Sequence, residues 1–337
     1  MDISKVTPFK QTCQRGYRAP GLRIAFTRRA ATTLQTHFNM AKLITVFGAT
    51  GSQGGSVANA LLEDQDFKVR AVTRNASSDK AKALQEKGAE VVVASLDDPS
   101  TLEPALQGAH GVFVVTNYFE HLDQEREVKQ GKAVADAARA AGVLHVVFSG
   151  LENVQKIAGF PCPHFDAKGQ IEEYMTSLEL PVTVVRYPFY YENYLNVLKP
   201  QKQEDGTYVL GVPMEGAAMD SVSVADMGPA VREIFKNWAE WVRRTVGFTA
   251  DKLTIQQYAD ILSKHLAPKV FKATDMTADA FGQLGFPGAD DLGNMFKFIR
   301  LYSPDRSLDL TRQLHPAAKT FDTWVGENKD VLQNALD

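Results

Sequence analysis

Apolar and β-branched residues occur in short runs along this chain, and the runs alternate with segments of helical spacing. The first run, residues 43–47, leads into three glycines and then into residues 56–63, which have the apolar spacing and the good helix formers of an α-helix. The predicted strands are residues 43–47, 68–73, 89–94, 111–115, 144–148 and 182–185, and the further predicted helices between them are residues 79–87, 99–107, 120–141 and 165–177. This alternation predicts right-handed βαβ crossovers and therefore an α/β fold with a Rossmann-type, doubly wound parallel sheet.

The pattern changes after the sixth predicted strand. Residues 187–199 are rich in aromatic side chains, residues 200–223 have the pattern of short strands and turns, and residues 226–241 are predicted to form a helix that returns to the main sheet. The remaining predicted elements are helices over 254–266, 278–284, 290–300 and 317–327 and a short strand over 270–272. We therefore expect a Rossmann core over residues 40–186 and a smaller, mostly helical C-terminal lobe over residues 187–337, with returning elements that complete the core.

The composition is that of a globular protein without a membrane span. Of the 337 residues, 44% are hydrophobic and 23% are charged, and no apolar run approaches the ~18 residues that cross a bilayer. The two cysteines, Cys13 and Cys162, lie far apart in the sequence and cannot define a disulfide framework or a metal cluster. We therefore expect no metal site and no membrane insertion, and we expect Cys162 to be a free loop thiol.

The charge is unevenly distributed along the chain. Residues 1–39 hold seven basic side chains and one acidic one, so this leader carries +6, while the whole chain carries −3 and the remainder −9. An acidic body argues against direct nucleic-acid binding. The leader is predicted to be disordered. Its composition indicates either a mitochondrial transit peptide or an extension ahead of an internal start at Met40. The expected location is the cytoplasm with access to the nucleus, or the mitochondrion if the leader is a transit peptide.

Three glycines stand where the first predicted strand meets the first predicted helix, at Gly48, Gly51 and Gly54. The first backbone N–H groups of a helix have no partner within it, and the helix dipole adds positive charge there, so a pyrophosphate can bind directly to the main chain. Any Cβ would block that approach. The spacing differs from the commoner Gly-x-Gly-x-x-Gly, and a purely structural turn would need the same residues, so neighbouring positions must decide.

The end of the second predicted strand indicates which nucleotide is bound. An NAD site normally places Asp or Glu there, whereas a 2′-phosphate requires a cation and no acid. This strand ends Val72-Thr73-Arg74-Asn75, with one arginine and no acid. The sequence therefore favours NADP(H), although Arg74 could also be an ordinary surface arginine.

Several motifs together resemble the short-chain dehydrogenase/reductase superfamily and, within it, the NmrA-like family of atypical members. The motifs are Gly48-Ala49-Thr50-Gly51-Ser52-Gln53-Gly54-Gly55, Val72-Thr73-Arg74-Asn75, Thr116-Asn117-Tyr118, Glu127-Val128-Lys129-Gln130-Gly131-Lys132, Ser149-Gly150-Leu151-Glu152-Asn153, His164-Phe165-Asp166-Ala167-Lys168-Gly169 and Gly285-Phe286-Pro287-Gly288-Ala289. The resemblance covers essentially residues 42–335 and excludes the leader.

The resemblance also implies which residues contact the cofactor. It assigns the glycine loop to the pyrophosphate, the end of the second strand to the 2′-phosphate, and four aromatic or polar residues after the sixth strand to a cover over the nicotinamide. Many relatives carry Asp beside the adenine, where this chain has Ser95-Leu96, so that contact is the least secure. The candidate cofactor residues are Gly48, Ala49, Thr50, Gly51, Ser52, Gln53, Gly54, Arg74, Asn75, Ser95, Leu96, Thr116, Asn117, Tyr118, Lys129, Lys168, Tyr190, Tyr191, Glu192 and Asn193.

The candidate catalytic residues are His164, Lys168 and Ser149. Carbonyl-reducing relatives commonly use Tyr-x-x-x-Lys, in which the ammonium one helical turn away assists a tyrosine that delivers the proton. Here histidine holds the tyrosine position. It could act as a proton donor or be a histidine at a helix start with a structural hydrogen bond, and we favour the structural role.

These features favour an NADPH-binding redox sensor that acts through protein partners and has little or no dehydrogenase activity. The resemblance implies such a regulator, a homodimer, and a partner similar to the argininosuccinate synthase suggested for a vertebrate relative. The alternative is an NADPH-dependent reductase of quinones or small carbonyls that uses Lys168 and His164.

Overall fold

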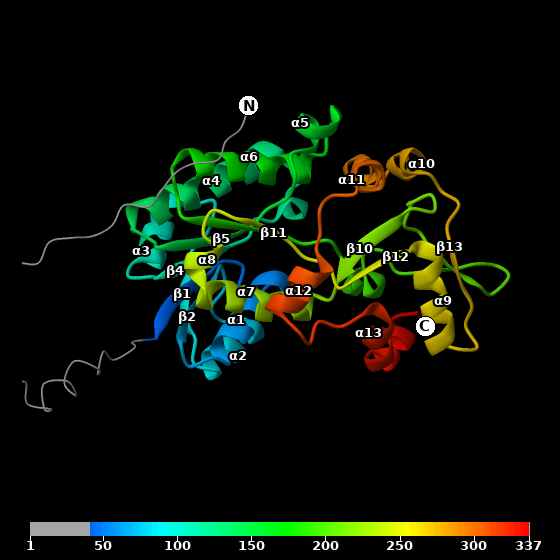
Figure 1. The fold of residues 1–337 in the computed structure, drawn as a ribbon, viewed down its shortest axis with the longest axis horizontal. Helices are drawn as coiled ribbons and strands as arrows, with labels where there is room; N and C mark the ends of the chain where they lie inside the picture. The colour runs from blue at the N-terminus through cyan, green and yellow to red at the C-terminus, as the bar shows by residue number, and fades with distance from the viewer. Residues whose placement is uncertain (1–40, 337) are drawn as a thin grey trace, which may run out of the picture. The chain divides into compact units, whose positions relative to one another are not determined.

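Seven strands form the main sheet of the computed structural model, which describes residues 41–336 (Figure 1). Their order is β11-β6-β5-β4-β1-β2-β3, and every neighbouring pair is parallel. The strands are β1 (Lys42–Val46), β2 (Phe67–Thr73), β3 (Glu90–Val93), β4 (Gly111–Val114), β5 (His145–Ser149), β6 (Val182–Arg186) and β11 (Thr245–Gly247). The strand order reverses between β1 and β4, which confirms the predicted Rossmann-type fold and sets the binding edge of the sheet beside β1. Predictions about residues 1–39 lie outside the described residues.

Helices cover both faces of this sheet. They are α1 (Ser52–Leu62), α2 (Asp79–Glu86), α3 (Leu102–Leu106), α4 (Gln124–Ala140), α5 (Val154–Ala158), α6 (Pro163–Ser177), α7 (Met227–Lys236) and α8 (Trp238–Trp241). Apolar residues of α1 and α7 share one core cluster with β1 and β2, and those of α3, α4 and α6 share another with β4, β5 and β6 (Figure 1). Helix α7 lies close against α1 because Gly228 has no Cβ, and a Cβ there would collide with the Ser56 carbonyl.

Most predicted elements of the first 186 residues are present, with shifted ends. Helix α4 begins at Gln124, four residues later than expected, because residues 118–120 form a separate 3-10 turn and Asp123 caps the helix by accepting a hydrogen bond from Arg126 N. The single helix expected over residues 226–241 is wrong, since α7 and α8 are divided at Asn237. The seventh strand, β11, was not predicted because three residues carry too little pattern.

The C-terminal lobe contains two small sheets as well as helices. One sheet has the order β12-β10-β7 and the other β13-β9-β8. Their strands are β7 (Phe189–Tyr190), β8 (Gln201–Lys202), β9 (Tyr208–Leu210), β10 (Ala218–Val222), β12 (Asp251–Thr254) and β13 (Phe271–Ala273), and the helices are α9 (Ile255–His265), α10 (Ala278–Gly282), α11 (Ala289–Tyr302), α12 (Leu308–Leu314), α13 (Phe321–Glu327) and α14 (Lys329–Leu336). The aromatic rings of Tyr194, Tyr258 and Phe321 pack together at the centre of this lobe.

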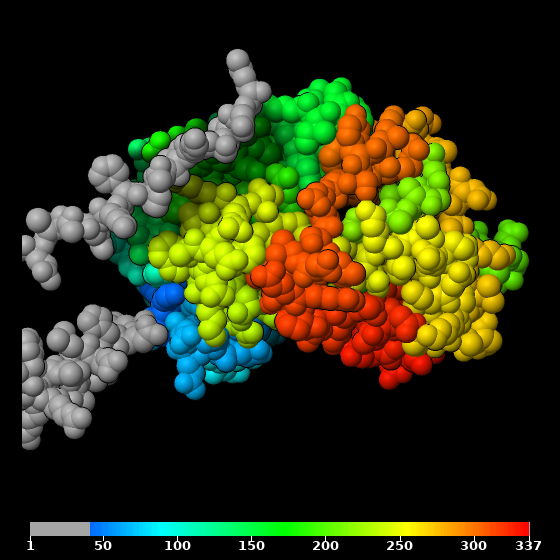
Figure 2. Space-filling view, in the orientation of Figure 1, coloured from blue at the N-terminus to red at the C-terminus, as the bar shows by residue number. Residues whose placement is uncertain are grey.

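The lobe packs directly on the Rossmann core. Helix α11 contacts α6, and in Figure 2 the orange surface of α11 abuts the green surface of the core. Residues from Ala41 onward form one compact unit, so the boundary expected after residue 186 lies inside that unit. None of the helices in residues 41–336 is long and apolar enough to cross a membrane.

Candidate functional site

The glycine loop between β1 and α1 offers unpaired backbone donors. Gly48 has a left-handed φ of +65°, and a Cβ on Gly54 would collide with the Gly48 carbonyl. The first backbone hydrogen bond of the helix runs from Gly55 N to Gly51 O at 2.9 Å, and no group in residues 41–336 accepts from the amides of Ser52, Gln53 or Gly54. No acidic residue lies in the first turn. The loop therefore fits a pyrophosphate on geometric and electrostatic grounds.

Arg74 follows β2, as the sequence predicts, and its side chain is 64% exposed. In this structure it forms an ion pair with Glu120, in the 3-10 turn after β4. The Asn75 side chain accepts hydrogen bonds from Ser77 N and Ser77 Oγ, which orders the turn after the strand. Arg74 is thus available to an anion, but an acidic side chain already competes for it.

The position proposed for the adenine contact follows β3. Ser95 Oγ accepts from Asp97 N at 3.2 Å, so its hydroxyl helps to shape this turn. Asp97 binds Arg126 and Gln130 of α4, and the Arg126 hydrogen bond is the largest cause of a lowered pKa for its carboxyl. The turn that holds Ser95 and Leu96 is therefore fixed to α4.

Lys168 lies in a buried network beneath the binding edge. Its Nζ donates to Thr116 O at 2.9 Å, to Thr116 Oγ1 at 2.8 Å and to Glu127 Oε1 at 2.8 Å. An ammonium has three donors, so all are used. Glu127 is fully buried, and its Oε2 has no hydrogen-bond partner in residues 41–336. Lys168 must release one of these bonds before it can donate to a ribose hydroxyl.

Gln53, in the first turn of α1, joins Ser149 of β5 to Tyr190 of β7. Ser149 Oγ donates to Gln53 Oε1 at 2.6 Å, and Gln53 Nε2 donates to Tyr190 OH at 2.7 Å. Burial is the largest cause of a raised pKa for Tyr190. The structure therefore brings together three residues, Gln53, Ser149 and Tyr190, that the sequence singled out for different reasons.

His164 forms a buried pair with Asp291 of α11. His164 Nδ1 lies 2.6 Å from Asp291 Oδ2, and the Cys162 thiol lies 3.8 Å from the same ring nitrogen. Ligand atoms of these three buried residues fall within 4.8 Å of one another. Two ligands of a tetrahedral zinc ion would lie about 3.3 Å apart, so the shorter His164–Asp291 distance is that of a hydrogen bond. Cys162 is a free thiol in a loop, as expected, and it is also buried, which raises its pKa.

A cavity of about 550 Å³ lies between the Rossmann core and the C-terminal lobe. On the core side it is lined by Gln53, Thr116, Tyr118, His164 and Lys168. On the lobe side its wall is mainly apolar, and includes Phe189, Leu292, Met295 and Ile299. Burial, and then the charge of Asp291, raises the pKa of Tyr118 to about 12. The cavity therefore presents phenols, apolar surface and the carboxylate of Asp220, while its cationic side chains, Lys168 and Arg306, are paired with Glu127 and Glu152.

Comparison with known proteins identifies the family. The model of the NmrA-like family matches residues 40–324. An NmrA-like family domain-containing protein of Dictyostelium discoideum is 35% identical over 242 residues, which cover 68% of this chain and 80% of the relative. The chain belongs to the NmrA-like family.

Other NmrA-like relatives carry different descriptions. The NmrA-like family domain-containing oxidoreductase lnaB of Aspergillus flavus is 31% identical over 307 residues, covering 81% of this chain and 90% of the relative. NmrA-like family domain-containing protein 1 of Rattus norvegicus is 26% identical over 288 residues, covering 86% of this chain and 96% of the relative. The family prediction is confirmed, and the relatives include proteins described as oxidoreductases.

Two solved structures share the fold. NmrA, described as a negative transcriptional regulator and solved in complex with NADP, matches with a TM-score of 0.72 at 22% identity over 88% of this chain and 99% of its own. The NADPH-dependent quinone oxidoreductase QOR2 of Escherichia coli, solved with NADPH, matches with a TM-score of 0.71 at 23% identity over 85% of this chain and 98% of its own. The shared architecture therefore occurs in a regulator and in a reductase.

Tyr191 and Glu192, which the NmrA-like resemblance assigns to a cover over the nicotinamide, do not line the cavity. Tyr191 is fully buried in the lobe core and donates to Lys319 O, and Glu192 accepts from Ser223 Oγ and Val224 N. Both follow β7 in a 3-10 turn, where side chains no longer alternate between two faces. Tyr190 and Asn193 do line the cavity, and the cover over the nicotinamide stays a prediction.

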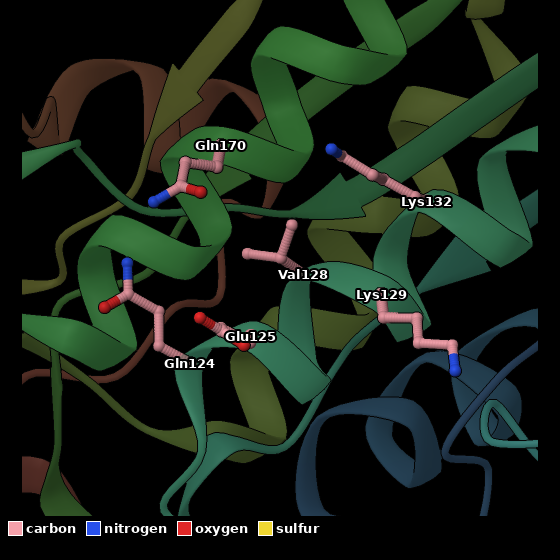
Figure 3. A pocket seen from close by; sticks show the side chains of 6 residues that line it. All are labelled: Gln124, Glu125, Val128, Lys129, Lys132 and Gln170. Atoms are coloured by element: carbon pink, nitrogen blue, oxygen red, sulfur yellow. The ribbon is translucent and has the colours of Figure 1, made fainter.

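Lys129 lies on the outer side of α4. Glu127, two positions earlier, faces the interior, and two residues of a helix turn the side chain by about 200°. Lys129 is accordingly exposed beside a solvent-open groove between α4 and α6, and Figure 3 shows it directed away from Gln124 and Gln170. Its assignment to the cofactor stays a prediction.

Two important residues were missed from the sequence. Glu127 lies within a quoted motif, and its signal was a charge on the buried face of α4, which also carries Gln130 and Val134. Asp291 is 127 positions from His164 and had no local signal. Pairing across the lobes could not be inferred without the fold.

Proposed function

We propose that this NmrA-like protein is an NADPH-dependent reductase of small, neutral, apolar carbonyl compounds, including quinones. The observation that carries this proposal is the cavity. It begins at Gln53, Thr116 and Lys168, beside the loop that fits a pyrophosphate, and continues into the apolar wall of the C-terminal lobe. A protein that only bound a nucleotide would have no need of that second, apolar compartment.

The cofactor assignment rests on the donors at the carboxyl edge of the sheet. The unpaired amides after Gly51 fit the pyrophosphate, and Arg74 offers a cation where the 2′-phosphate would lie. NADPH would supply the hydride. Ser149 and Tyr190, joined through Gln53, would hold the amide end of the cofactor or the substrate oxygen.

The test uses the purified full-length chain with a panel of quinones, aldehydes and ketones, and the loss of NADPH absorbance as the readout. A Met295→Trp variant fills the cavity from α11, and Leu301→Trp is its matched control, because Leu301 is 54% exposed on the same helix. We expect turnover in the wild type and the control, and a strong loss in Met295→Trp with NADPH binding retained. A wild-type protein that binds NADPH and reduces none of the panel contradicts the proposal.

A second candidate is an NADPH-binding regulator that acts through protein partners. It is favoured by His164 in the position of the usual tyrosine and by the complete use of the Lys168 donors within the protein. A homodimer, a partner similar to argininosuccinate synthase, and a cytoplasmic location with nuclear access belong to this candidate. Sedimentation with and without NADPH tests it, since a sensor requires two states with different nucleotide affinity.

A further inference from the structure

His164 and Lys168 lie one turn apart on α6, and each has its own buried carboxylate. Lys168 Nζ is 2.8 Å from Glu127 Oε1 of α4, within the Rossmann core. His164 Nδ1 is 2.6 Å from Asp291 Oδ2 of α11, in the C-terminal lobe. Both carboxylates are 2% exposed or less. The positive charge of Lys168 is therefore balanced by Glu127, and Asp291 would balance the charge of a protonated His164.

The pair leaves one ring nitrogen of His164 for a ligand. Nδ1 is committed to Asp291, and Nε2 has no hydrogen-bond partner in residues 41–336. The rings of Tyr118, Phe119 and Phe165 surround the imidazole, with centroids 6.0, 5.0 and 4.8 Å away. His164 itself lines the cavity. A substrate oxygen in the cavity can thus meet Nε2, while aromatic packing and Asp291 hold the ring.

We propose that His164 donates the proton in the reduction and that Asp291 is its positioning residue, delivered by the C-terminal lobe. This inference rests on the reductase function proposed above. Asp291 accepts from Nδ1–H, so it fixes the ring with Nε2 toward the cavity. The lobe therefore contributes a part of the proton-transfer machinery as well as an apolar wall.

The step balances for a carbonyl substrate. The carbonyl carbon accepts the hydride that NADPH supplies, the C=O π electrons move to oxygen, and that oxygen takes the proton from Nε2–H. The products are the alcohol, NADP⁺ and a neutral imidazole, which regains a proton from water. The titratable groups near the ring are Cys162, Asp291, Tyr118 and, one turn along α6, Lys168 with Glu127.

The first experiment compares Asp291→Asn with Asp290→Asn. Asp290 is exposed on the same first turn of α11, so its variant removes the same charge without touching the ring. We expect kcat to fall by about 10²-fold in Asp291→Asn, with KM for NADPH unchanged. Asp290→Asn should match the wild type. The loss caused by Asp291→Asn should disappear in a His164→Gln background, because the carboxylate acts through the imidazole.

A second measurement does not depend on turnover. In protein labelled with ¹⁵N-histidine, the His164 Nδ1–H proton should give a strongly deshielded signal that is lost in His164→Gln and in Asp291→Asn and kept in Asp290→Asn. If Asp291→Asn does not fold, Asp291→Glu replaces it, and a partial recovery of kcat is expected because the carboxylate is retained.

The outcomes separate the two proposals. Unchanged kcat in folded Asp291→Asn, or a loss that persists in the His164→Gln background, overturns the role of Asp291. Absence of the deshielded proton overturns the pair itself. If the proton is present but the wild type reduces no compound of the panel, the reductase function fails, and with it the proton-donor role, while the pair stands as a structural link between the lobes.

Discussion

The two sides of the cavity are built in different ways. Residues 41–186 form the nucleotide side from local motifs, in which backbone amides and side chains close in sequence meet at the ends of neighbouring strands. Residues 187–336 form the other side from isolated side chains, such as Asp291 and Arg306, that reach the core from distant segments. The nucleotide side can thus be specified by short sequence patterns, whereas the lobe depends on single residues that are far apart in the sequence.

Two buried ion pairs allow the contributions of the two sides to stability to be compared directly. Lys168–Glu127 lies wholly within the nucleotide side, whereas Arg306–Glu152 joins the two sides. Removing one partner of each pair should show which side the stability of the fold depends on more strongly.

Lys168→Met should give the largest loss of stability. It leaves Glu127, which is fully buried, without its cation, and breaking a buried pair costs about 3–5 kcal/mol. Chemical denaturation of the variant, followed by circular dichroism, measures the free energy of unfolding. The double variant Lys168→Met/Glu127→Gln should recover much of the loss, because no charge is left unpaired. Equal stability of the single and double variants would show that water reaches Glu127.

Arg306→Met should have a smaller effect. Arg306 donates to both carboxylate oxygens of Glu152, at 2.7 and 3.2 Å, but Arg186 remains 3.7 Å away and keeps part of the charge balance. Burial acts to raise the pKa of Glu152, and the hydrogen bond and charge of Arg306 outweigh it, so that the pKa is lowered. We expect a loss of about 2–3 kcal/mol by the same denaturation assay. Arg312→Met, at an exposed site on α12, is the control and should leave stability unchanged.

The difference between local motifs on the nucleotide side and isolated side chains from the lobe explains how far the sequence predicts the structure. The strands of the nucleotide side are apolar runs bounded by turns, and the glycine loop and Arg74 follow strand ends, so local pattern places them correctly at one edge of the sheet. The directions of the Tyr191 and Glu192 side chains could not be predicted, because the strand before them is only two residues long and is followed by a 3-10 turn. The alternation of side chains between the two faces of a strand therefore could not be extended to residues in that turn.

The lobe was predicted less completely for a second reason. Its small sheets pair strands of two to five residues from separate segments, and such short strands carry little periodicity. The aromatic residues after β6 were seen as a group, yet the fold divides them, since Tyr190 faces the cavity and Tyr194 packs in the lobe core. Burial by a partner distant in sequence is a property of the fold and leaves no local signal.

Acidification should destabilise the nucleotide side through His145. This residue is fully buried in β5, and burial lowers its pKa to about 3. Its pKa in the unfolded chain is about 6.5, so the folded state is fully favoured above that pH and loses stability as the pH falls from 6.5 toward 3. Between pH 7 and pH 5 the loss should be about 2 kcal/mol. His145→Gln should weaken this dependence, whereas His121→Gln, which replaces the residue after the 3-10 turn that follows β4, should retain it.

Arg74→Gln should weaken NADPH binding without changing NADH binding. The guanidinium is the cation that the sequence places for the 2′-phosphate, and it is largely exposed, so a loss of about tenfold in affinity is expected. Titration of NADPH and NADH by fluorescence gives the ratio, and Arg139→Gln, at an exposed site near the end of α4, is the control. An equal loss of affinity for both nucleotides would mean that Arg74 stabilises the conformation of the loop and does not bind the 2′-phosphate.

Glu120→Gln should have the smallest effect and the opposite sign. Arg74 pairs with Glu120 in this structure, and a 2′-phosphate must displace or share that carboxylate. Because both side chains are substantially exposed, the pair is worth about 0–1 kcal/mol, so NADPH affinity should rise by up to about fivefold and the gain should shrink in high salt. Glu125→Gln, exposed on the first turn of α4, serves as the control. A weaker NADPH complex in Glu120→Gln would instead show that Glu120 orients Arg74 toward the phosphate, and the nucleotide side would then also depend on a side chain from outside its own motif.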